Sequence, residues 1–412
     1  MIKNVKEDIA DKKFSSKIDA CELSPIRKFY PYMVAAEEKG RKVYHLNIGQ
    51  PDIETPKEFF DAVNSYSKKV LDYAPSPGVG EFLDAVQNYY KNVGISIEKK
   101  DILATYGGSE ALQMVLSCIL DEGDEVLIPE PYYPNYDTFV KMAGGVIKPI
   151  PTTPEEGYRF ASRERIEPLI TERTRAIMMT NPGNPTGVVL NSEERQIMAD
   201  IAREHDLFLI SDEVYRELVY HGEELHSMLE HREADENVII VDSVSKRFSA
   251  TGSRVGVVVS RNQELMTHAL KLCQSRLCTA TLDQIGAAAM YNVLTPDYYA
   301  DMRVEYRRRR DTVVEGLSKI PGAKFHVPDG AFYLMVTLPV DDTEKLQYFL
   351  LEEFEDNGET VMYAPGNGFY TTPGKGNNEI RVAYVNNCEE LTRSIELLRL
   401  GIEAYNARKE NA

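Results

Sequence analysis

The chain has 412 residues, of which 43% are hydrophobic and 27% are charged, a composition typical of a globular protein long enough for two domains. Its formal net charge of −18 argues against nucleic acid or an anionic membrane as the main partner, so an anionic ligand would need a local group of basic residues. No apolar run is long enough to span a membrane, and the N-terminus "MIKNVKEDIADKKF" is charged rather than signal-like. The five cysteines have no metal-ligand spacing, so we expect reduced thiols, a cytoplasmic location and no metal site.

The order of the patterns predicts an N-terminal segment and two domains. Residues 1–54 contain few strand patterns, and we expect them to pack with a small C-terminal α+β domain, residues 296–412. Residues 55–295 are predicted to form a large α/β domain. Within it, "DEVLIPEP", "RAIMMTN", "LFLISDE", "NVIIVDS" and "RVGVVVS" read as buried strands, and "SEALQMVLSCIL" and "SEERQIMADIAREHD" as helices. The sheet is predicted to be mostly parallel, although the short link between the last two strands allows an antiparallel pair.

A long helix is expected over "TPDYYADMRVEYRRRRDTVVEGLSKI", where the small domain begins. Its run of four arginines, Arg307 to Arg310, has two interpretations. The arginines would either bind a distal substrate carboxylate or form a solvated helix face, and the second interpretation is favoured because charge runs are usually solvated.

The stretch "SVSKRFSATGSRVG" places a lysine directly after the strand "NVIIVD". In an α/β sheet, ligands bind beyond the carboxyl ends of the strands. An amine there, partly desolvated and near other cations, has a lowered pKa and can act as a nucleophile. Lys246 alone would be taken for a surface lysine, but Ser243 and Arg254 beside it suit a phosphate group.

Three further motifs point to the same ligand. In "YGGSEAL", Gly108 allows close backbone approach and Ser109 is expected to cap a helix whose N-terminus attracts anions. The rigid loop "TNPGNPTG" presents Asn184, and "SDEVY" ends a strand with Asp212, a suitable partner for a protonated pyridine nitrogen. Tyr133 in "PEPYYPNY" is suited to stacking on an aromatic ring. One ligand explains these features together: a phosphorylated pyridine aldehyde bound covalently through Lys246.

The ordered motifs GGS, PYY, NPGNPTG, SDEVY and SVSK with an arginine eight residues later resemble those of the class I/II aminotransferases. The resemblance extends from "NIGQPD" to the last helix. It implies fold type I, with a mostly parallel mixed seven-stranded sheet in the large domain and a smaller α+β domain. It also implies pyridoxal 5′-phosphate (PLP) as the cofactor.

The resemblance implies a role for each matching residue. Lys246 would hold the cofactor and carry protons, Asp212 would bind the pyridinium N–H, and Tyr215 and Asn184 would contact the ring oxygen O3′. Asn184 would also reach the substrate carboxylate. The remaining implied contacts are the ring stacking of Tyr133, phosphate binding by Gly108, Ser109, Ser243 and Arg254, and substrate α-carboxylate binding by Arg381 with Gly49. Ser245 has the simpler interpretation of a turn hydroxyl. Tyr73 resembles the tyrosine that reaches the phosphate of a neighbouring subunit, so a homodimer is expected.

The implied reaction moves the amino group of an L-amino acid, with an aspartate-like substrate preferred, to a 2-oxo acid such as 2-oxoglutarate. Aromatic, alanine and aminoadipate aminotransferases, a C–S β-lyase and a cyclopropane-forming synthase remain alternatives. A PLP-sensing DNA-binding regulator is disfavoured by the short N-terminal segment and the negative charge. Ser109 stands where some aspartate enzymes have a lysine. Arg276 is therefore the candidate for a distal carboxylate in the partner's site, with an interface salt bridge as the equal alternative.

Overall fold

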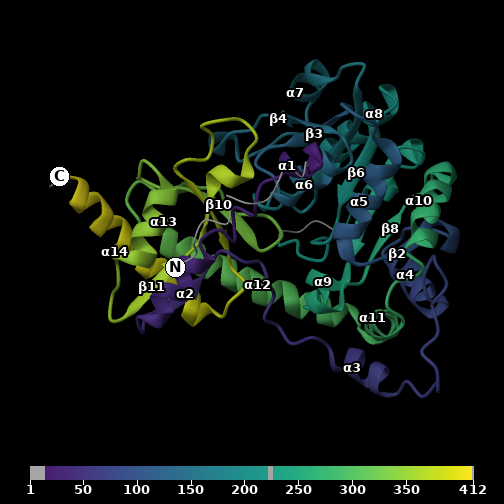
Figure 1. The fold of residues 1–412 in the computed structure, drawn as a ribbon, viewed down its shortest axis with the longest axis horizontal. Coiled ribbons are helices and arrows are strands. Elements are labelled where there is room, and N and C mark those ends of the chain that lie inside the picture. The colour runs from purple at the N-terminus through teal and green to yellow at the C-terminus, as the bar shows by residue number, and fades with distance from the viewer. Residues whose placement is uncertain (1–13, 221–225, 411–412) are drawn as a thin grey trace.

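A mixed sheet of seven strands forms the centre of the larger part of the chain (Figure 1). The fold is that of a computed structural model, which describes residues 14–220 and 226–410. The strands lie in the order β2-β8-β7-β6-β5-β3-β4, and only β8 runs antiparallel to its neighbours. Their bounds are β2 Ile102–Thr105, β3 Glu125–Pro129, β4 Val146–Ile150, β5 Thr174–Thr180, β6 Phe208–Asp212, β7 Val238–Ser243 and β8 Gly256–Val259. The predicted seven-stranded sheet and its antiparallel β7–β8 pair are confirmed.

Helices cover both faces of this sheet, which explains why its strands are apolar on both sides. One face packs on α4, α8 and α11, and the other on α5, α6 and α10. The bounds are α4 Gly80–Asn92, α5 Gly107–Ile119, α6 Asn135–Met142, α8 Ser192–Glu204, α10 Gln263–Ser275 and α11 Thr281–Val293. The predicted helix at α8 begins with a reciprocal capping box between Asn191 and Glu194, so its start is encoded locally.

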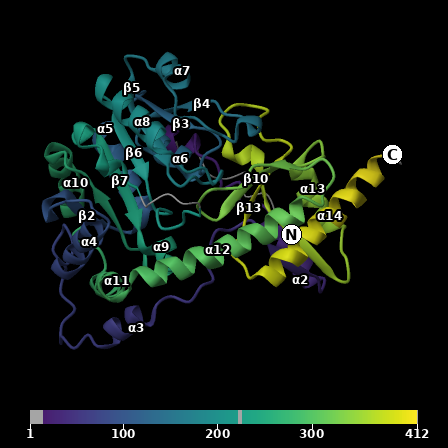
Figure 2. The same cartoon turned by 180° about the vertical axis from the view of Figure 1, so that it is seen from behind.

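The smaller part contains a four-stranded antiparallel sheet, β12-β13-β10-β9, and the parallel pair β1–β11. These strands are β1 Lys42–His45, β9 Lys324–Phe325, β10 Tyr333–Thr337, β11 Glu359–Met362, β12 Ala364–Pro365 and β13 Glu379–Ala383. The helices are α2 Tyr30–Glu38, α12 Pro296–Leu317, α13 Thr343–Glu352 and α14 Cys388–Glu410. Figure 2 shows α12 running from the large part to the small one. We propose domain boundaries after residues 54 and 295, with support from the start of α12 and from the β1–β11 pair.

The N-terminal segment contacts both parts, whereas we expected it to pack with the small domain. Its helix α1 (Ser16–Asp19) lies beside α6, where Lys141 donates a 3.0 Å hydrogen bond to the backbone oxygen of Ala20. Its later elements, α2 and β1, belong to the small part. The segment therefore crosses from one domain to the other, and residues 1–13 of it lie outside the described part of the chain.

The arginine run on α12 is not a uniformly solvated face, which corrects the favoured interpretation. Arg309 and Arg310 are buried, at 5% and 4% exposure. Arg309 pairs with Asp52 and with Glu305, and Arg310 donates to the backbone oxygen of Pro328. The run instead helps to attach α12 to the N-terminal segment and to the small domain. No helix within the described residues is long and apolar enough to cross a membrane.

Candidate active site

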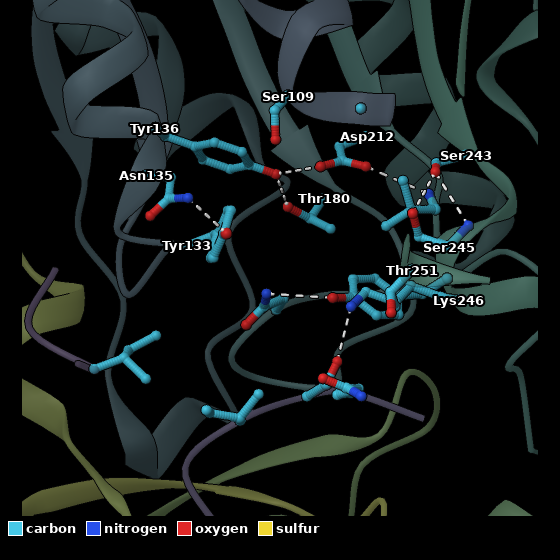
Figure 3. A pocket seen from close by; sticks show the side chains of 18 of the residues that line it. Ser109, Tyr133, Asn135, Tyr136, Thr180, Asp212, Ser243, Ser245, Lys246 and Thr251 are labelled. Carbon is cyan, nitrogen blue, oxygen red and sulfur yellow. Dashed lines mark hydrogen bonds between the residues drawn. The ribbon is translucent and has the colours of Figure 1, made fainter. Parts of the chain in front are cut away.

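A cavity of about 360 Å³ lies beyond the carboxyl ends of β5, β6 and β7 (Figure 3). This is the edge at which the sequence predicted ligand binding. The cavity is closed in part by the N-terminal segment and by β13 of the small domain. The predicted residues that line it are Gly49, Gly108, Ser109, Tyr133, Asn184, Asp212, Tyr215, Ser243, Ser245, Lys246, Arg254 and Arg381.

Lys246 reaches the cavity from α9 (Val244–Arg247), a single helical turn that follows β7 and is capped by Ser243. Its Nζ donates a 2.7 Å hydrogen bond to the backbone oxygen of Gly49. Burial, with smaller contributions from the positive charges of Arg381 and Arg254, lowers the pKa of Lys246 to about 8. The negative charge of Asp212 acts in the opposite direction. An appreciable fraction of this amine is therefore neutral, and so nucleophilic, near pH 7.

Asp212 ends β6 with its carboxylate in the cavity. Oδ2 accepts a 2.7 Å hydrogen bond from the hydroxyl of Tyr136, which also lies 2.6 Å from Oγ1 of Thr180 (Figure 3). Burial raises the pKa of Asp212 to about 6, against the hydrogen bonds from Tyr136 and the backbone N–H of Val214. A buried carboxylate supported in this way is ready to receive a cationic group.

An anion site forms where α5 begins. Gly107 has φ +71°, and a Cβ there would lie 2.5 Å from Nη2 of Arg254, so only glycine lets the guanidinium lie against the helix N-terminus. Arg254 is held by the backbone oxygens of Thr251, at 3.1 Å, and Tyr106, at 3.4 Å. The prediction that Ser109 caps this helix is wrong, because α5 already begins at Gly107, with Tyr106 as the cap residue. Ser109 lies in the first turn and still lines the cavity.

Two serines complete the cavity wall beside Lys246. Oγ of Ser243 lies 2.8 Å from Oγ of Ser245 and 2.9 Å from the backbone oxygen of Val255. Figure 3 shows both hydroxyls on the same side of the cavity as Lys246. Ser245 therefore has a place in the cavity wall, beyond the turn hydroxyl that its sequence suggested.

Arg381 enters the cavity from β13 and is 2% exposed. Its Nη1 donates to Oδ1 of Asn184 at 3.1 Å, and Nη2 donates to the backbone oxygen of Asn47 at 2.5 Å. The guanidinium also lies over the ring of Tyr333, 4.4 Å from its centroid. Nε of Arg381 and Oδ1 of Asn47 have no hydrogen-bond partner among the described residues. A buried donor such as this Nε and a buried acceptor such as this Oδ1 normally have partners, so the two atoms mark a position for a polar ligand group.

Asn184 lies between Arg381 and Tyr215 and is within hydrogen-bond distance of both. Its Nδ2 lies 3.4 Å from the hydroxyl of Tyr215, which in turn lies 3.2 Å from the hydroxyl of Tyr333. Burial raises the pKa of Tyr215 well above its usual range, so this phenol keeps its proton. Tyr133 stands on the side of the cavity opposite Ser243 and Ser245, and its hydroxyl accepts a 2.7 Å hydrogen bond from Asn135 (Figure 3).

Tyr73 and Arg276 are the predicted site residues that do not line this cavity. Tyr73 is 79% exposed. The guanidinium of Arg276 lies 3.2 Å from the carboxylate of Glu110 and donates to the backbone oxygen of Ala104. Within one chain Arg276 is therefore a structural residue. Its predicted entry into a partner's site concerns an assembly and stays a prediction.

The sequence reasoning missed several residues of the cavity. Tyr136 stands in the same run "PYYPNY" as Tyr133, but it lies in the first turn of α6 whereas Tyr133 precedes that helix, so no single periodicity marked both. Asn47 was visible only as part of "NIGQPD". Thr180 stands at the end of the predicted strand "RAIMMTN" but was given no role, and Tyr333 and Arg27 had no sequence signal, because they reach the cavity from separate elements of the fold.

Comparison with known proteins agrees with this geometry. The family model described as "Aminotransferase class I and II" matches residues 41–396. The aspartate/prephenate aminotransferase of Thermus thermophilus is 33% identical over 364 residues, covering 87% of this chain and 90% of that protein. The aspartate aminotransferase of Bacillus subtilis is 32% identical over 377 residues, covering 89% and 93% respectively.

Solved structures show the same similarity. A single mutant of Thermus thermophilus aspartate aminotransferase matches with a TM-score of 0.86 at 30% identity, covering 95% of this chain and 100% of that one. An alanine aminotransferase from Pyrococcus furiosus matches equally well, with a TM-score of 0.86 at 30% identity and the same coverage. The overall fold is thus common to proteins with different named substrates.

Proposed function

The chain belongs to the class I and II aminotransferase family, and on that premise we propose that it is an aspartate-preferring aminotransferase that binds PLP through Lys246. The aminotransferase activity follows from the family. The observation that carries the rest is one cavity in which Lys246, Asp212 and Arg254 converge from three different elements. Lys246 has the lowered pKa that suits the aldehyde, Asp212 is a buried carboxyl that suits the ring nitrogen, and Arg254 has the positive charge that suits the phosphate.

The described residues fit PLP. Arg254, Ser243, Ser245 and the N-terminus of α5 would hold the phosphate, because they gather hydroxyls, backbone N–H groups and a guanidinium at one end of the cavity. Asp212 would bind the pyridine nitrogen, and Tyr215 with Asn184 would bind the ring oxygen O3′. Bound PLP supplies an electron sink that lowers the energy of a carbanion at the substrate Cα.

The residues of this chain then bind the substrate and move its proton. Lys246, with a pKa of about 8, can take the proton from Cα in its neutral form and deliver it again as the ammonium. Asp212 holds a proton on the ring nitrogen, because a buried carboxylate without a cation is unfavourable. Arg381, whose Nε has no hydrogen-bond partner among the described residues, would bind the α-carboxylate and thereby orient Cα toward Lys246.

The preference for aspartate requires a second positive charge at the cavity. The lysine and arginine side chains that line it in the described part of the chain are Arg27, Lys246, Arg254 and Arg381. The last three have roles already, so Arg27 of the N-terminal segment is the proposed partner of a distal carboxylate. Arg27 is exposed at the cavity mouth, where it can pair with aspartate, glutamate or 2-oxoglutarate.

A homodimer is the proposed assembly. Exposed apolar side chains occur in α3 (Lys57–Asn64) and in the segment between α3 and α4, at Phe60, Val70, Leu71 and Tyr73. In Figure 1 this stretch forms an arm at the edge of the large domain. Exposed apolar clusters of this kind are typical of protein interfaces. An interface here would bring Tyr73 into contact with a second copy of the chain.

The test is a half-reaction with purified protein and PLP. We expect visible absorption from bound PLP, its loss on addition of L-aspartate, and recovery with 2-oxoglutarate. Lys246→Ala is the matched control, in which the phosphate site remains but both spectral changes are absent. Alanine and phenylalanine serve as comparison substrates. A faster reaction with either of them than with aspartate would contradict the substrate proposal but leave the aminotransferase assignment intact.

A further inference from the structure

A cluster of four charged side chains lies buried next to the cavity but outside its lining. Glu213, Arg216, Asp242 and Arg247 are each at most 2% exposed, and none of them lines the cavity. We call them the rear cluster. It contains two arginines and two acidic side chains, and burial raises the pKa of Glu213 to about 7. Because burying charges is costly even when they are paired, such a group needs an explanation beyond stability.

All four members of the rear cluster are chain neighbours of cavity residues, and Arg216 follows Tyr215. Glu213 follows Asp212, Asp242 precedes Ser243, and Arg247 follows Lys246. Adjacent residues of a strand point to opposite faces, so the end of each strand sends one side chain into the cavity and its neighbour behind it. One peptide bond therefore joins each rear-cluster residue to a cavity residue, so a shift of the cluster side chains is expected to move the cavity side chains.

Arg247 ties the turn that carries Lys246 back to its strand. Its Nη2 bonds to Oδ2 of Asp242 at 2.7 Å, and its Nη1 donates to the hydroxyl of Tyr291 at 2.6 Å. The guanidinium lies 4.3 Å from the ring centroid of Tyr89. Oδ1 of Asp242 accepts a 2.7 Å hydrogen bond from the backbone N–H of Ser243. One carboxylate thus bridges the end of β7 and the end of α9.

Arg216 extends the cluster to β6. Its Nη1 lies 3.4 Å from Oε2 of Glu213, and its Nη2 lies 3.8 Å from Oδ2 of Asp242. Oε1 of Glu213 accepts a 3.0 Å hydrogen bond from the backbone N–H of Met228. The rear cluster therefore spans the ends of β6 and β7, the two strands that deliver Asp212 and Ser243.

The turn α9 has only four residues, too few for helical hydrogen bonds to hold it in place. Besides the 3.2 Å backbone hydrogen bond from Val244 to the oxygen of Val255, two side-chain contacts hold its ends, the Ser243 cap and the Arg247–Asp242 ion pair. We propose that Arg247 and Asp242 are positioning residues, which hold Lys246 at its desolvated place opposite Asp212. The proposal rests on the proposed function for the role of Lys246, but the placement of Lys246 is a property of the PLP-free chain as well.

The consequence concerns the environment of Lys246. The charged groups that face it are Asp212 from β6, Arg254 from the loop before β8, and Arg381 from β13. If the turn loosens, water reaches the amine, and the pKa of Lys246 rises toward that of an ordinary lysine. The amine of Lys246 would also lose its alignment with the substrate Cα. Binding of the substrate carboxylate by Arg381 would change little.

The experiment compares Arg247→Met, Arg247→Lys and Asp242→Asn with the wild type. In the PLP-free chain, the pH midpoint for acylation of Lys246 by acetic anhydride is followed by peptide mass spectrometry. In the PLP-loaded enzyme, kcat and KM for L-aspartate are measured. With Arg247→Met and Asp242→Asn we expect the midpoint to rise by at least half a unit, kcat to fall roughly 10- to 100-fold, and KM to change less than about threefold. Arg247→Lys should recover part of both losses.

Arg261→Met is the matched control. Arg261 is also a mostly buried arginine, paired with Asp235 at 2.6 Å, but it does not line the cavity or touch the rear cluster. It should lower the melting temperature and leave the Lys246 midpoint unchanged. A folded Arg247→Met with a wild-type midpoint and kcat would overturn the proposal. If Arg247→Met does not fold, Asp242→Asn and Arg247→Lys decide in the same way. A shifted midpoint in a chain without transaminase activity would support positioning while contradicting the proposed function.

Discussion

The hydroxyl of Tyr136 donates a 2.7 Å hydrogen bond to Oδ2 of Asp212, and this bond joins the first turns of α6 to the end of β6. This bond lowers the pKa of the Asp212 carboxyl, whereas burial raises it, and the net pKa is about 6. Tyr136 therefore helps to keep a buried carboxylate ionised, as a partner of a protonated ring nitrogen must be.

Tyr136→Phe should move the acid limb of the pH–kcat/KM profile to higher pH. The ionised carboxylate loses a hydrogen-bond donor, so the pKa of Asp212 rises further, by about one unit. We expect less than a tenfold loss of activity at pH 8 and a larger one at pH 6. Profiles of the PLP-loaded variant and the wild type give the measurement, and superimposable acid limbs would exclude the effect.

Asp212→Asn should separate activity from stability. We expect kcat to fall on the order of 10³-fold, because the ring nitrogen loses its charged partner. The PLP-free variant should nevertheless be more stable than the wild type at pH 8. The folded pKa of about 6 lies above the unfolded value, so folding binds a proton between the two, and the carboxylate costs stability at pH values above the folded pKa.

The gain in unfolding free energy should reach at most about 3 kcal/mol at pH 8 and shrink as the pH falls toward 4. Urea unfolding of the PLP-free proteins at several pH values measures it. Glu172→Gln, at an exposed carboxylate, should show no such gain. A pH-independent difference for Asp212→Asn would contradict a raised pKa.

Lys246 should be the most reactive lysine of the PLP-free chain at neutral pH. With a pKa of about 8, roughly a quarter of it is neutral at pH 7.5, against about 0.1% of an unperturbed lysine. Limited acylation followed by peptide mapping should label residue 246 before any other lysine. Added PLP followed by borohydride should block the same position, and preferential reaction at another lysine would remove Lys246 from its proposed role.

Substitutions of Arg27 and of Arg276 should have different effects on substrate preference. Arg27→Leu should lower kcat/KM for aspartate and glutamate roughly 10- to 100-fold and leave alanine nearly unchanged. Arg276→Leu should reduce stability, because Glu110 loses its partner, and affect both substrate classes alike. A selective loss with Arg276→Leu alone would instead assign the distal carboxylate to Arg276 of a second subunit, as the sequence first suggested.

The exposed arm predicts the assembly. Sedimentation of the wild type should give a dimer, and Leu71→Asp, which places a charge in the apolar cluster, should yield monomers with weakened PLP binding. Tyr73→Phe should keep the dimer, because the ring remains in the apolar cluster, and lose PLP affinity, because the proposed contact with the neighbour's phosphate is made by the hydroxyl. A fully active wild-type monomer would be incompatible with both statements.

The family and the fold were predictable because their signals are local. Apolar runs followed by Asp212, Ser243 and Lys246 mark strands and their carboxyl ends whatever the rest of the chain does, and the comparisons confirm the resemblance drawn from the ordered motifs. The prediction that Ser109 caps α5 failed for a local reason. Gly107 has a positive φ, which lets the helix start three residues earlier, and a glycine pair does not reveal which of the two adopts it.

The sequence by itself determined which elements form and which side chains stand at their ends, since periodicity and turn chemistry depend on neighbours in the chain. Only the tertiary structure decided the partners and pKa values of those side chains. Tyr136 on Asp212, Asn47 on Arg381 and Arg247 on Asp242 join residues of different elements, and burial shifts the pKa of Lys246 and Asp212. Desolvation depends on every atom that surrounds a group, and a one-dimensional pattern does not contain that environment.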